Sequence, residues 1–369
     1  QILNTEWREK MKAAVVQKIR HAVITDISDP VVKEGSMKVR VEACAVCGSD
    51  LRIFLKGDPR ATFPRIIGHE IAGTIAEVAP GLTGFTVGER VAIAPGHGCG
   101  KCKYCKNGMG NVCIHPQPSI GYASSGGFAQ YIVPPANVVE NGFVNKIPDN
   151  LTFEQASMAE LLACCINGQE RAQVGNGDTV LIIGAGPAGC MHIQLARVRG
   201  ASKVMIANRS AGRLQMAVDR FHPDAAFTEQ GDALVQKVLA ETDGLGADVV
   251  IVAAPSHEAQ ENALHLVAPR GRVNFFGGLP KDNCIAHLDT NIVHYKECML
   301  TGASSSLGRQ NREALKLLSE NKIESLKYIT HRFTLDEFNE AFAAVERHET
   351  IKAVIYPWKT KKEIQKMVN

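Results

Sequence analysis

Two short motifs place side chains of metal-binding type close together in the chain. Cys47-Gly48-Ser49-Asp50 is followed at a short distance by Gly68-His69-Glu70. A thiolate, an imidazole and a carboxylate are the ligand types that hold a tetrahedral zinc. Ser49 stands two residues after the cysteine, where its hydroxyl could reach an oxygen bound to the metal. The mixed ligand types beside a hydroxyl indicate chemistry rather than scaffolding.

A second cluster contains only cysteines, with the spacing C-x2-C-x2-C-x7-C. Four thiolates can close a tetrahedral zinc completely, so such a site ties down a loop and leaves no open position for chemistry. An iron–sulfur cluster is an alternative on ligand type alone, and a chance group of thiols in a loop is another. The four residues are Cys99, Cys102, Cys105 and Cys113.

A glycine-rich segment, Gly184-Ala185-Gly186-Pro187-Ala188-Gly189, has the pattern G-x-G-x-x-G. It follows an apolar run and precedes a helical stretch, which is the context expected for a dinucleotide-binding turn. The glycines allow a tight turn and a close approach of a pyrophosphate to the helix N-terminus. A glycine-rich turn without a ligand is the alternative. We expect Gly184, Gly186, Pro187, Ala188 and Gly189 to bind the cofactor.

The residues about 20 positions further on bear on the choice of nucleotide. An Asp or Glu there would hold the ribose 2′-hydroxyl, but this chain has Asn208-Arg209-Ser210, with Arg213 close by. Because no carboxylate stands at this position, nothing there would repel a 2′-phosphate, and a guanidinium could bind that phosphate bidentately. We therefore expect NADP to be favoured over NAD, although Asn208 could still bond a ribose hydroxyl and Arg209 could stack on adenine.

The surrounding patterns predict two kinds of structure. The first part of the chain has short alternating strands at Met37–Ala43, Ile71–Val78 and Arg90–Ile93. From Leu161 on, apolar strands alternate with helices, which implies a parallel doubly wound sheet. Its strands are expected at Val180–Ile183, Lys203–Ala207, Asp248–Ala253 and Arg272–Phe276. Near the end of the chain we expect a capping box at Thr334 to Glu337 and a strand at Ala353–Tyr356. Between them we expect a helix with one apolar face, formed by Phe338, Ala341, Phe342 and Val345.

Composition limits the classes of protein that the chain can belong to. Its 369 residues suit two domains, and the net charge of +3 with scattered basic residues argues against nucleic acid as a partner. The basic tail from Lys359 to Lys366 is expected to be a solvated helix rather than a binding arm. No apolar run is long enough for a membrane span, and no signal peptide is evident. Met11 resembles a natural start, so we expect residues 1–10 to be an extension.

Eleven cysteines without a secretory signal favour a reducing compartment, and we expect a cytoplasmic location. The cysteines outside the two clusters match no ligand pattern, and we expect them to be small buried residues. They are Cys44, Cys164, Cys165, Cys190, Cys284 and Cys298.

With these elements in this order, the chain from Met11 resembles the zinc-containing medium-chain dehydrogenase/reductase superfamily, and most of all its sorbitol and threonine dehydrogenase branch. The resemblance implies an α/β fold in which a GroES-like, mostly β catalytic domain is joined to a Rossmann domain. The expected domains are residues 11–165, 166–305 and 306–369, the last returning to the catalytic domain. The motifs that carry the resemblance are Cys47 to Asp50, Gly68 to Glu70, the four cysteines, Gly126 to Tyr131 and Gly184 to Gly189.

By that resemblance Cys47, His69 and Glu70 fall on catalytic-zinc positions. Glu160 falls on a further carboxylate position that can bind zinc directly or through water. The branch usually has Pro after this Glu, whereas this chain has Leu161, and Glu160 could instead be a plain helix-start carboxylate. The four-cysteine cluster falls on the structural-zinc position.

The resemblance also implies the reaction. The zinc would polarise the hydroxyl of a secondary alcohol, Ser49 would relay its proton, and a hydride would pass to NAD(P), giving a ketone. The substrate could be a polyol, a sugar, a sugar phosphate or a hydroxy amino acid such as threonine. Because Arg52 and Arg60 are cationic, a phosphorylated or acidic substrate is also compatible with the sequence. Asp50 would orient a ligand. An inactive nucleotide-binding zinc protein and a zinc-ribbon module are the competing classes, and a homotetramer or dimer is expected.

Overall fold

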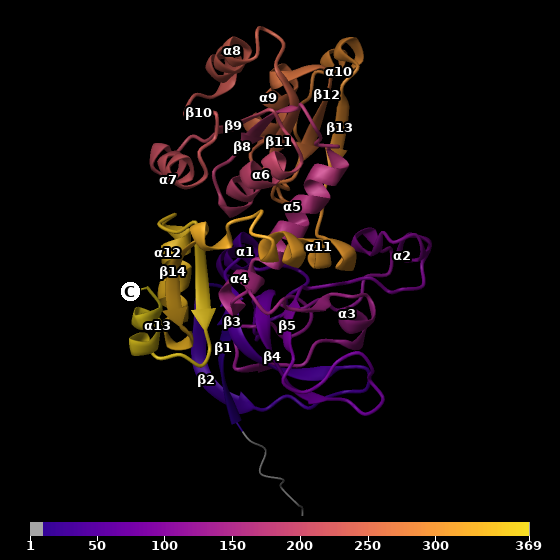
Figure 1. Cartoon of the computed structure of the whole chain (residues 1–369), viewed down its shortest axis with the longest axis vertical. Coiled ribbons are helices and arrows are strands. Elements are labelled where there is room, and N and C mark those ends of the chain that lie inside the picture. Colours follow the sequence, from indigo (N-terminus) through magenta and orange to yellow (C-terminus); the bar gives the residue numbers. More distant parts are fainter. Residues whose placement is uncertain (1–9, 369) are drawn as a thin grey trace, which may run out of the picture. The chain divides into compact units, whose positions relative to one another are not determined.

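The computed structural model describes residues 10–368, which divide into two units (Figure 1). The first unit contains the described residues up to Glu160, together with Leu307–Ser319 and the residues from Ile329 onward. The second contains Leu161–Ser306 and Glu320–Tyr328. We keep the domain boundaries of the sequence analysis as a proposal. This division suggests moving the first boundary to residue 160 and adding residues 320–328 to the nucleotide domain. Residues 1–9 of the expected extension lie outside the described residues.

The first unit is built on a seven-stranded, mostly antiparallel sheet. Its strand order is β14-β15-β3-β4-β5-β7, and β6 pairs with β3. Strand β3 alternates buried and less buried residues from Met37 to Glu42, as a sheet with one face on a core requires, whereas β4 is buried from Glu70 to Gly73 and more exposed after Ile75. The bounds are β3 (Met37–Ala45), β4 (Glu70–Val78), β5 (Arg90–Ile93), β6 (Tyr131–Ile132), β7 (Val144–Lys146), β14 (Ile329–Thr334) and β15 (Lys352–Tyr356), beside a separate hairpin of β1 (Lys10–Lys18) and β2 (His21–Ser28).

Short helices lie at the ends of these strands. The basic tail forms helix α13, in which the lysines are exposed and Ile364 is buried, as expected for a solvated helix. The helices of this unit are α1 (Gly48–Lys56), α2 (Lys103–Lys106), α3 (Ala136–Glu140), α4 (Phe153–Ser157), α11 (Gly308–Ser319), α12 (Phe338–Glu346) and α13 (Lys361–Val368).

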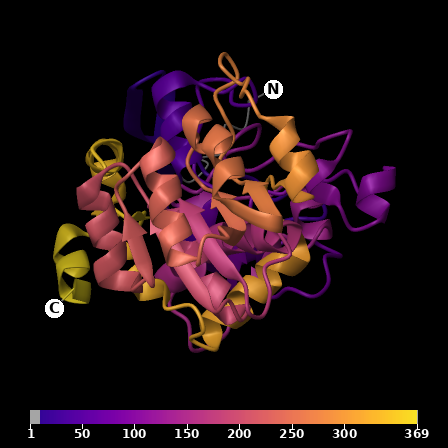
Figure 2. The same ribbon diagram turned by 90° about the horizontal axis from the view of Figure 1, so that it is seen from above.

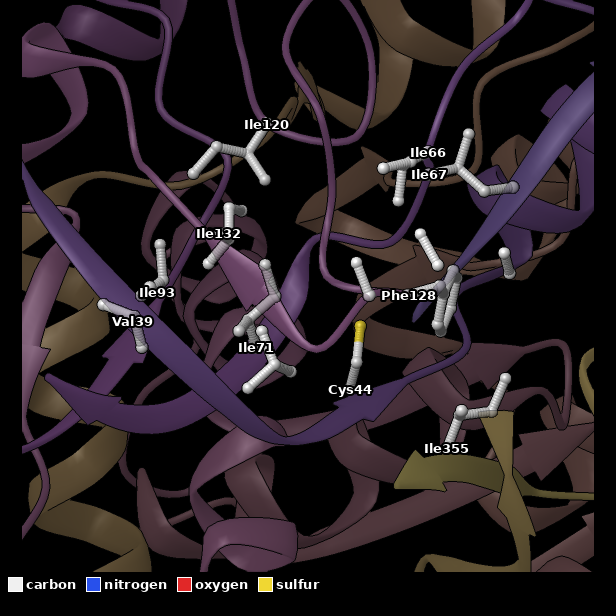
Figure 3. Close-up of a cluster of buried hydrophobic side chains, with 14 of the residues drawn as sticks. Val39, Cys44, Ile66, Ile67, Ile71, Ile93, Ile120, Phe128, Ile132 and Ile355 are labelled. Atoms are coloured by element: carbon white, nitrogen blue, oxygen red, sulfur yellow. The ribbon is translucent and has the colours of Figure 1, made fainter. Parts of the chain in front are cut away.

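An aromatic group joins the C-terminal segment to the core of the first unit. The ring of Phe338 stacks on that of Phe342 at 4.2 Å and meets the edge of Phe128 at 5.4 Å. The expected capping box forms, because Glu337 Oε2 accepts from the Thr334 backbone N–H at 2.9 Å. Figure 3 shows Phe128 in the same core as Cys44, Ile71 and Ile355. The end of the chain therefore belongs to the unit that begins it.

The second unit is a six-stranded parallel sheet with the order β10-β9-β8-β11-β12-β13. The chain runs outward from β8 through β9 to β10, then crosses back to β11. Ligands bind beyond the carboxyl ends of the strands at such a reversal. Helices surround the sheet (Figure 2). The strands are β8 (Thr179–Ile183), β9 (Lys203–Ala207), β10 (Ala225–Phe227), β11 (Ala247–Val252), β12 (Val267–Phe275) and β13 (Met299–Gly302).

The helices of this unit begin with α5, whose first two residues belong to the first unit. The expected fold class, a mostly β unit joined to a doubly wound parallel sheet, is confirmed. The helices are α5 (Ala159–Arg171), α6 (Pro187–Val198), α7 (Ala211–Phe221), α8 (Gly231–Glu241), α9 (His257–Leu266) and α10 (Thr290–Lys296).

The cysteines outside the two clusters are mostly, but not all, core residues. Four of them are buried, Cys164 is partly buried and Cys284 is exposed. The expectation of burial was wrong for Cys284, which lies in the loop between β12 and α10 where no strand or helix covers it. The buried ones are Cys44, Cys165, Cys190 and Cys298.

Candidate metal and nucleotide sites

Strand pairing brings the first three candidate ligands together. β3 ends two residues before Cys47, and β4 begins at Glu70, directly after His69. Because the two strands are antiparallel and Ala45 pairs with Glu70, the end of one lies beside the start of the other. The Cys47 sulfur, a His69 ring nitrogen and a Glu70 carboxylate oxygen all lie within 4.8 Å of one another. Their spacing and chemistry fit a metal ion such as zinc.

Asp50 fixes the geometry of these ligands. Its carboxylate, which is fully buried, accepts from the Cys47 backbone N–H at 3.0 Å and from the Gly68 N–H at 3.1 Å. Its Oδ1 atom also lies 3.0 Å from His69 Nδ1. A carboxylate can only accept, so Nδ1 carries the proton and Nε2 is left for a metal. Gly68 has a φ of +99°, and a Cβ there would lie 2.8 Å from Phe128, so only glycine fits this turn.

The electrostatics around His69 follow from this arrangement. Burial by itself would lower the pKa of His69, but the charge of Asp50, with those of Tyr122 and Cys47, outweighs burial and raises it well above the ordinary value. Ser49, half-buried at the first turn of α1, has its Oγ 3.3 Å from His69 Nε2. The serine hydroxyl therefore lies where it can bond a group held at Nε2.

A buried lysine balances the charge of Glu70. Lys352 begins β15, which pairs with β3 next to Cys47, and its Nζ lies 2.6 Å from Oε1 and 2.5 Å from Oε2 of Glu70. Burial would lower the pKa of Lys352, but Glu70 and Cys47 outweigh it and raise the pKa, so the lysine stays charged. The carboxylate of Glu70 is thus held by a cation even without a metal.

Glu160 lies outside the three-ligand group. It is buried at the start of α5, and its charge contributes to the raised pKa of Lys352. With Ser157, Asn145 and Asn311 it lines a small pocket of about 10 Å³, which is room for about one water molecule. The structure therefore brings Glu160 toward Lys352 but not within the distance that joins Cys47, His69 and Glu70.

The four-cysteine cluster has the geometry of a single tetrahedral ion. The Cys99 and Cys105 sulfurs lie 3.9 Å apart, and those of Cys102 and Cys113 lie 3.8 Å apart. All four sulfurs lie within 4.8 Å of one another, which fits four bonds of about 2.3 Å to one zinc, whereas an iron–sulfur cluster distributes its thiolates over two or more irons. Backbone N–H groups are directed at the sulfurs, and the one from Cys105 contributes most to lowering the pKa of Cys102 to about 6. Within residues 10–368 these are the two groups that could hold a metal.

The glycine-rich turn lies at the carboxyl end of β8 and opens α6. Gly186 is the N-cap of α6 and Pro187 its first residue. A Cβ on Gly189 would lie 1.8 Å from the Gly184 carbonyl oxygen, so helix and strand can pack this closely only with glycine there. A Cβ on Gly186 would meet open space, its nearest neighbour being Arg213 Nη2 at 3.9 Å. The open cradle with a guanidinium beside it fits a pyrophosphate or phosphate.

The residues after β9 line the same region. Asn208 Oδ1 accepts from the Ala185 backbone N–H at 3.0 Å, and its Nδ2 donates to the Ser210 carbonyl at 2.9 Å. Arg209 and Ser210 are exposed, and burial lowers the pKa of Arg213. The structure brings Asn208 and Arg213 to the glycine-rich turn, with no carboxylate at the end of β9 where one would repel a 2′-phosphate.

Two family models match the chain. The first, described as alcohol dehydrogenase GroES-like domain, matches residues 33–148. The second, described as zinc-binding dehydrogenase, matches residues 187–320.

Characterised relatives match along nearly the whole chain. A sorbitol dehydrogenase of Halalkalibacterium halodurans is 28% identical, covering 91% of this chain and 96% of its own. An L-threonine 3-dehydrogenase of Pyrococcus furiosus is 32% identical, with 94% and 98% covered. A D-arabitol-phosphate dehydrogenase of Enterococcus avium is 30% identical, with 89% and 92% covered.

The chain belongs to the zinc-containing medium-chain dehydrogenase/reductase superfamily. Solved structures agree with this membership. A zinc-binding dehydrogenase of Sinorhizobium meliloti bound to NADP has a TM-score of 0.85 at 27% identity, covering 95% of this chain and all of its own. An alcohol dehydrogenase of Escherichia coli in complex with NADH has a TM-score of 0.84 at 28% identity, covering 94% and 99%.

Membership in this superfamily confirms the expected class of enzyme. The chain is a zinc-dependent oxidoreductase that transfers a hydride between an alcohol and a nicotinamide nucleotide. The alternatives of an inactive nucleotide-binding protein and of a zinc-ribbon nucleic-acid module are not supported. Within residues 10–368 no helix is long and apolar enough to cross a membrane.

Two residues of the site were not found from the sequence. Lys352 stands at the start of an apolar strand. The sequence feature that could have pointed to it is a single lysine directly before the apolar residues Ala353-Val354-Ile355. Tyr122, whose ring lies 5.6 Å from that of His69, comes from a loop without a recognisable pattern. Their positions depend on strand pairing and loop packing over long sequence separations.

Lys352→Met is expected to destabilise the metal-free protein more than the zinc-loaded one. Without zinc, the change leaves Glu70 as a buried unpaired charge, which costs about 3–5 kcal/mol, whereas bound zinc would compensate that charge. Thermal unfolding with and without chelator measures both states. Lys12→Met, which breaks the exposed pair with Asp336, is the control and should cost about 1 kcal/mol or less. Equal losses with and without zinc would contradict this account of Lys352.

Proposed function

We propose that this enzyme oxidises a secondary alcohol of polyol type to a ketone at a zinc held by Cys47, His69 and Glu70. The convergence of these three ligands, with Ser49 at His69 Nε2, is the observation that carries the proposal. When bound, zinc supplies a Lewis acid that lowers the pKa of a substrate hydroxyl, and the nicotinamide accepts a hydride. We further propose that Cys99, Cys102, Cys105 and Cys113 hold a structural zinc.

The chain's own residues have distinct tasks in this proposal. Ser49 accepts the proton of the substrate hydroxyl and, being only half-buried, passes it toward solvent. Asp50 keeps the Nδ1 proton of His69 in place, so that Nε2 faces the metal. Lys352 pairs with the Glu70 carboxylate and restrains its orientation. Glu160 contributes its charge, and a contact through water, rather than a direct bond.

The relatives bear on the substrate. Of the three relatives described above, two are dehydrogenases of a polyol or a polyol phosphate, sorbitol and D-arabitol phosphate, and one is an L-threonine dehydrogenase. We propose a polyol or polyol derivative as substrate and retain L-threonine as the second candidate.

Cys47→Ser and His69→Ala are expected to lower kcat/KM for the best substrate by about 1,000-fold or more, since the lost Lewis acid contributes several kcal/mol. Metal analysis should show one zinc fewer per chain, and calorimetry should show unchanged nucleotide binding. A panel of polyols, polyol phosphates and L-threonine, each with NAD and NADP, identifies that substrate. Cys284→Ser, on an exposed thiol outside both clusters, is the control. Full activity in either ligand variant would refute the site.

NADP is proposed as the preferred nucleotide because Arg213 lies at the glycine-rich turn and no carboxylate ends β9. Arg213→Ala is expected to weaken NADP binding by about 10- to 100-fold, as the loss of charge-assisted hydrogen bonds implies, and to change NAD binding far less. Titration calorimetry with both nucleotides measures this. Arg270→Ala, on an exposed guanidinium of the same unit, is the control. Tighter binding of NAD than NADP by the unchanged enzyme would reverse the assignment.

A homo-oligomer is proposed from the open edge of the second unit. β13 ends the parallel sheet, and Met299 and Leu300 on it are 42% and 37% exposed, while Tyr295 nearby is 81% exposed. Unpaired edge strands with apolar side chains are sites of association. Light scattering should give the mass of a dimer or tetramer, and Leu300→Asp should lower it to that of one chain. A single-chain mass for the unchanged enzyme would contradict this. The proposed cytoplasmic location rests on the eleven cysteines, none of which forms a disulfide within residues 10–368.

A further inference from the structure

Two arginines lie beside the metal ligands and have no task in the proposed chemistry. Arg52 is on α1, three residues after Ser49, so the two side chains project from neighbouring positions on one face of the helix. Arg60 lies in the loop after α1, which is closed by a bridge between Asp58 and Ala61. The side chains of Arg52 and Arg60 are 50% and 56% exposed. Both guanidiniums are therefore accessible to a ligand.

The two arginines share one buried carboxylate. Asp58, 4% exposed, accepts from Arg60 Nε at 2.9 Å and Arg60 Nη2 at 2.9 Å, and also from Arg52 Nη2 at 3.3 Å. The single negative charge of Asp58 pairs with the two positive charges of Arg52 and Arg60. The cluster therefore keeps a net positive charge and several N–H donors. The repulsion between the two cations is relieved when a second anion joins them. The cluster is therefore complementary to an anion.

Tyr122 connects this cluster to the metal ligands. The Arg60 guanidinium carbon stacks 4.4 Å from the centre of the Tyr122 ring, and the same ring lies 5.6 Å from that of His69. The guanidinium is thus about 10 Å or less from the imidazole. Stacking on the ring, and pairing of Nε and Nη2 with Asp58, hold the Arg60 guanidinium in one orientation. Its opposite edge, which includes Nη1, faces away from Asp58 and suits a phosphate or carboxylate.

We propose that Arg60, supported by Arg52, binds an anionic group of the substrate at the end remote from the hydroxyl that is oxidised. This inference rests on the proposed alcohol oxidation and narrows its substrate to a secondary alcohol carrying a phosphate or a carboxylate. The separation between Arg60 and His69 requires a short carbon chain between the two groups. Neutral polyols lack the group that Arg60 binds and are poorer substrates.

Steady-state kinetics of the zinc-loaded enzyme test the proposal with matched substrates. These are a pentitol, the same pentitol with a terminal phosphate, and the corresponding sugar acid. The unchanged enzyme should prefer an anionic member, and comparing the phosphate with the acid identifies the anion. Arg60→Gln should raise KM for the preferred anion by about 10- to 100-fold, as loss of charged hydrogen bonds implies. Its kcat, and the KM for the neutral pentitol, should change about twofold or less.

Two further variants separate recognition from folding. Arg60→Lys keeps the charge but not the fork and should recover part of the affinity. Arg20→Gln removes a guanidinium that is 60% exposed and paired with Glu346, and should leave all three substrates unchanged. Equal turnover of the neutral and anionic pentitols by the unchanged enzyme would overturn the proposal. The proposal would also be overturned if Arg60→Gln raised KM equally for the neutral and the anionic pentitol.

A binding measurement keeps this test separate from the proposed reaction. Inorganic phosphate titrated into the zinc-loaded enzyme, with its nucleotide site saturated by NADP, should bind at least about tenfold more weakly to Arg60→Gln than to the unchanged protein. If no secondary alcohol is oxidised but this difference is found, the proposed function fails while the anion site stands. If alcohols are oxidised and phosphate binding is the same in both proteins, the anion site fails alone.

Discussion

The Asp50 carboxylate is the group on which the rest of the metal site depends. Its two oxygens accept the backbone N–H groups of Cys47 and Gly68 and the Nδ1–H of His69, so one buried charge links both ligand-bearing loops. Hydrogen bonds to a charged group contribute about 1.5–3 kcal/mol each. They also fix the direction of the imidazole, which no packing contact could set as closely. The antiparallel pairing of β3 with β4 brings the two loops together, and Asp50 sets their final geometry.

Charge balance explains why the site needs residues beyond its ligands. Glu70 and Lys352 are both almost fully buried, and each would be costly alone. Together they form a neutral pair within the metal site, so the buried carboxylate of Glu70 has a partner of opposite charge before zinc binds. The Asp58 cluster has the opposite imbalance, with two cations on one carboxylate. One unit thus holds a balanced pair at the metal ligands and an unbalanced cluster nearby, which suits a substrate that itself carries a negative charge.

Much of this site could be predicted from local sequence, because local spacing determines it. Four cysteines within 15 residues must lie close together, and G-x-G-x-x-G after an apolar strand has few other uses. Four strands of the first unit, β3, β4, β5 and β15, were predicted within two residues, whereas β6, β7, β14 and the β1–β2 hairpin were not. The position of Lys352, 282 residues from Glu70, depends on the pairing of β15 with β3, which no local pattern encodes. Glu160 was expected among the ligands by resemblance, and only the folded backbone indicates its distance from them.

The pairing of Lys352 with Glu70 also has a consequence for how the protein is made. The ligands lie within the first 70 residues, but the cation that compensates Glu70 is the 352nd residue of 369. A growing chain therefore carries the ligands over the 282 residues that separate Glu70 from Lys352 without the strand that completes their surroundings. Contacts of such long sequence separation form late, because a long loop must close first. The sheet around the metal ligands is consequently finished only after β15 has been made, so correct metal loading depends on more of the chain than the segment that carries the ligands.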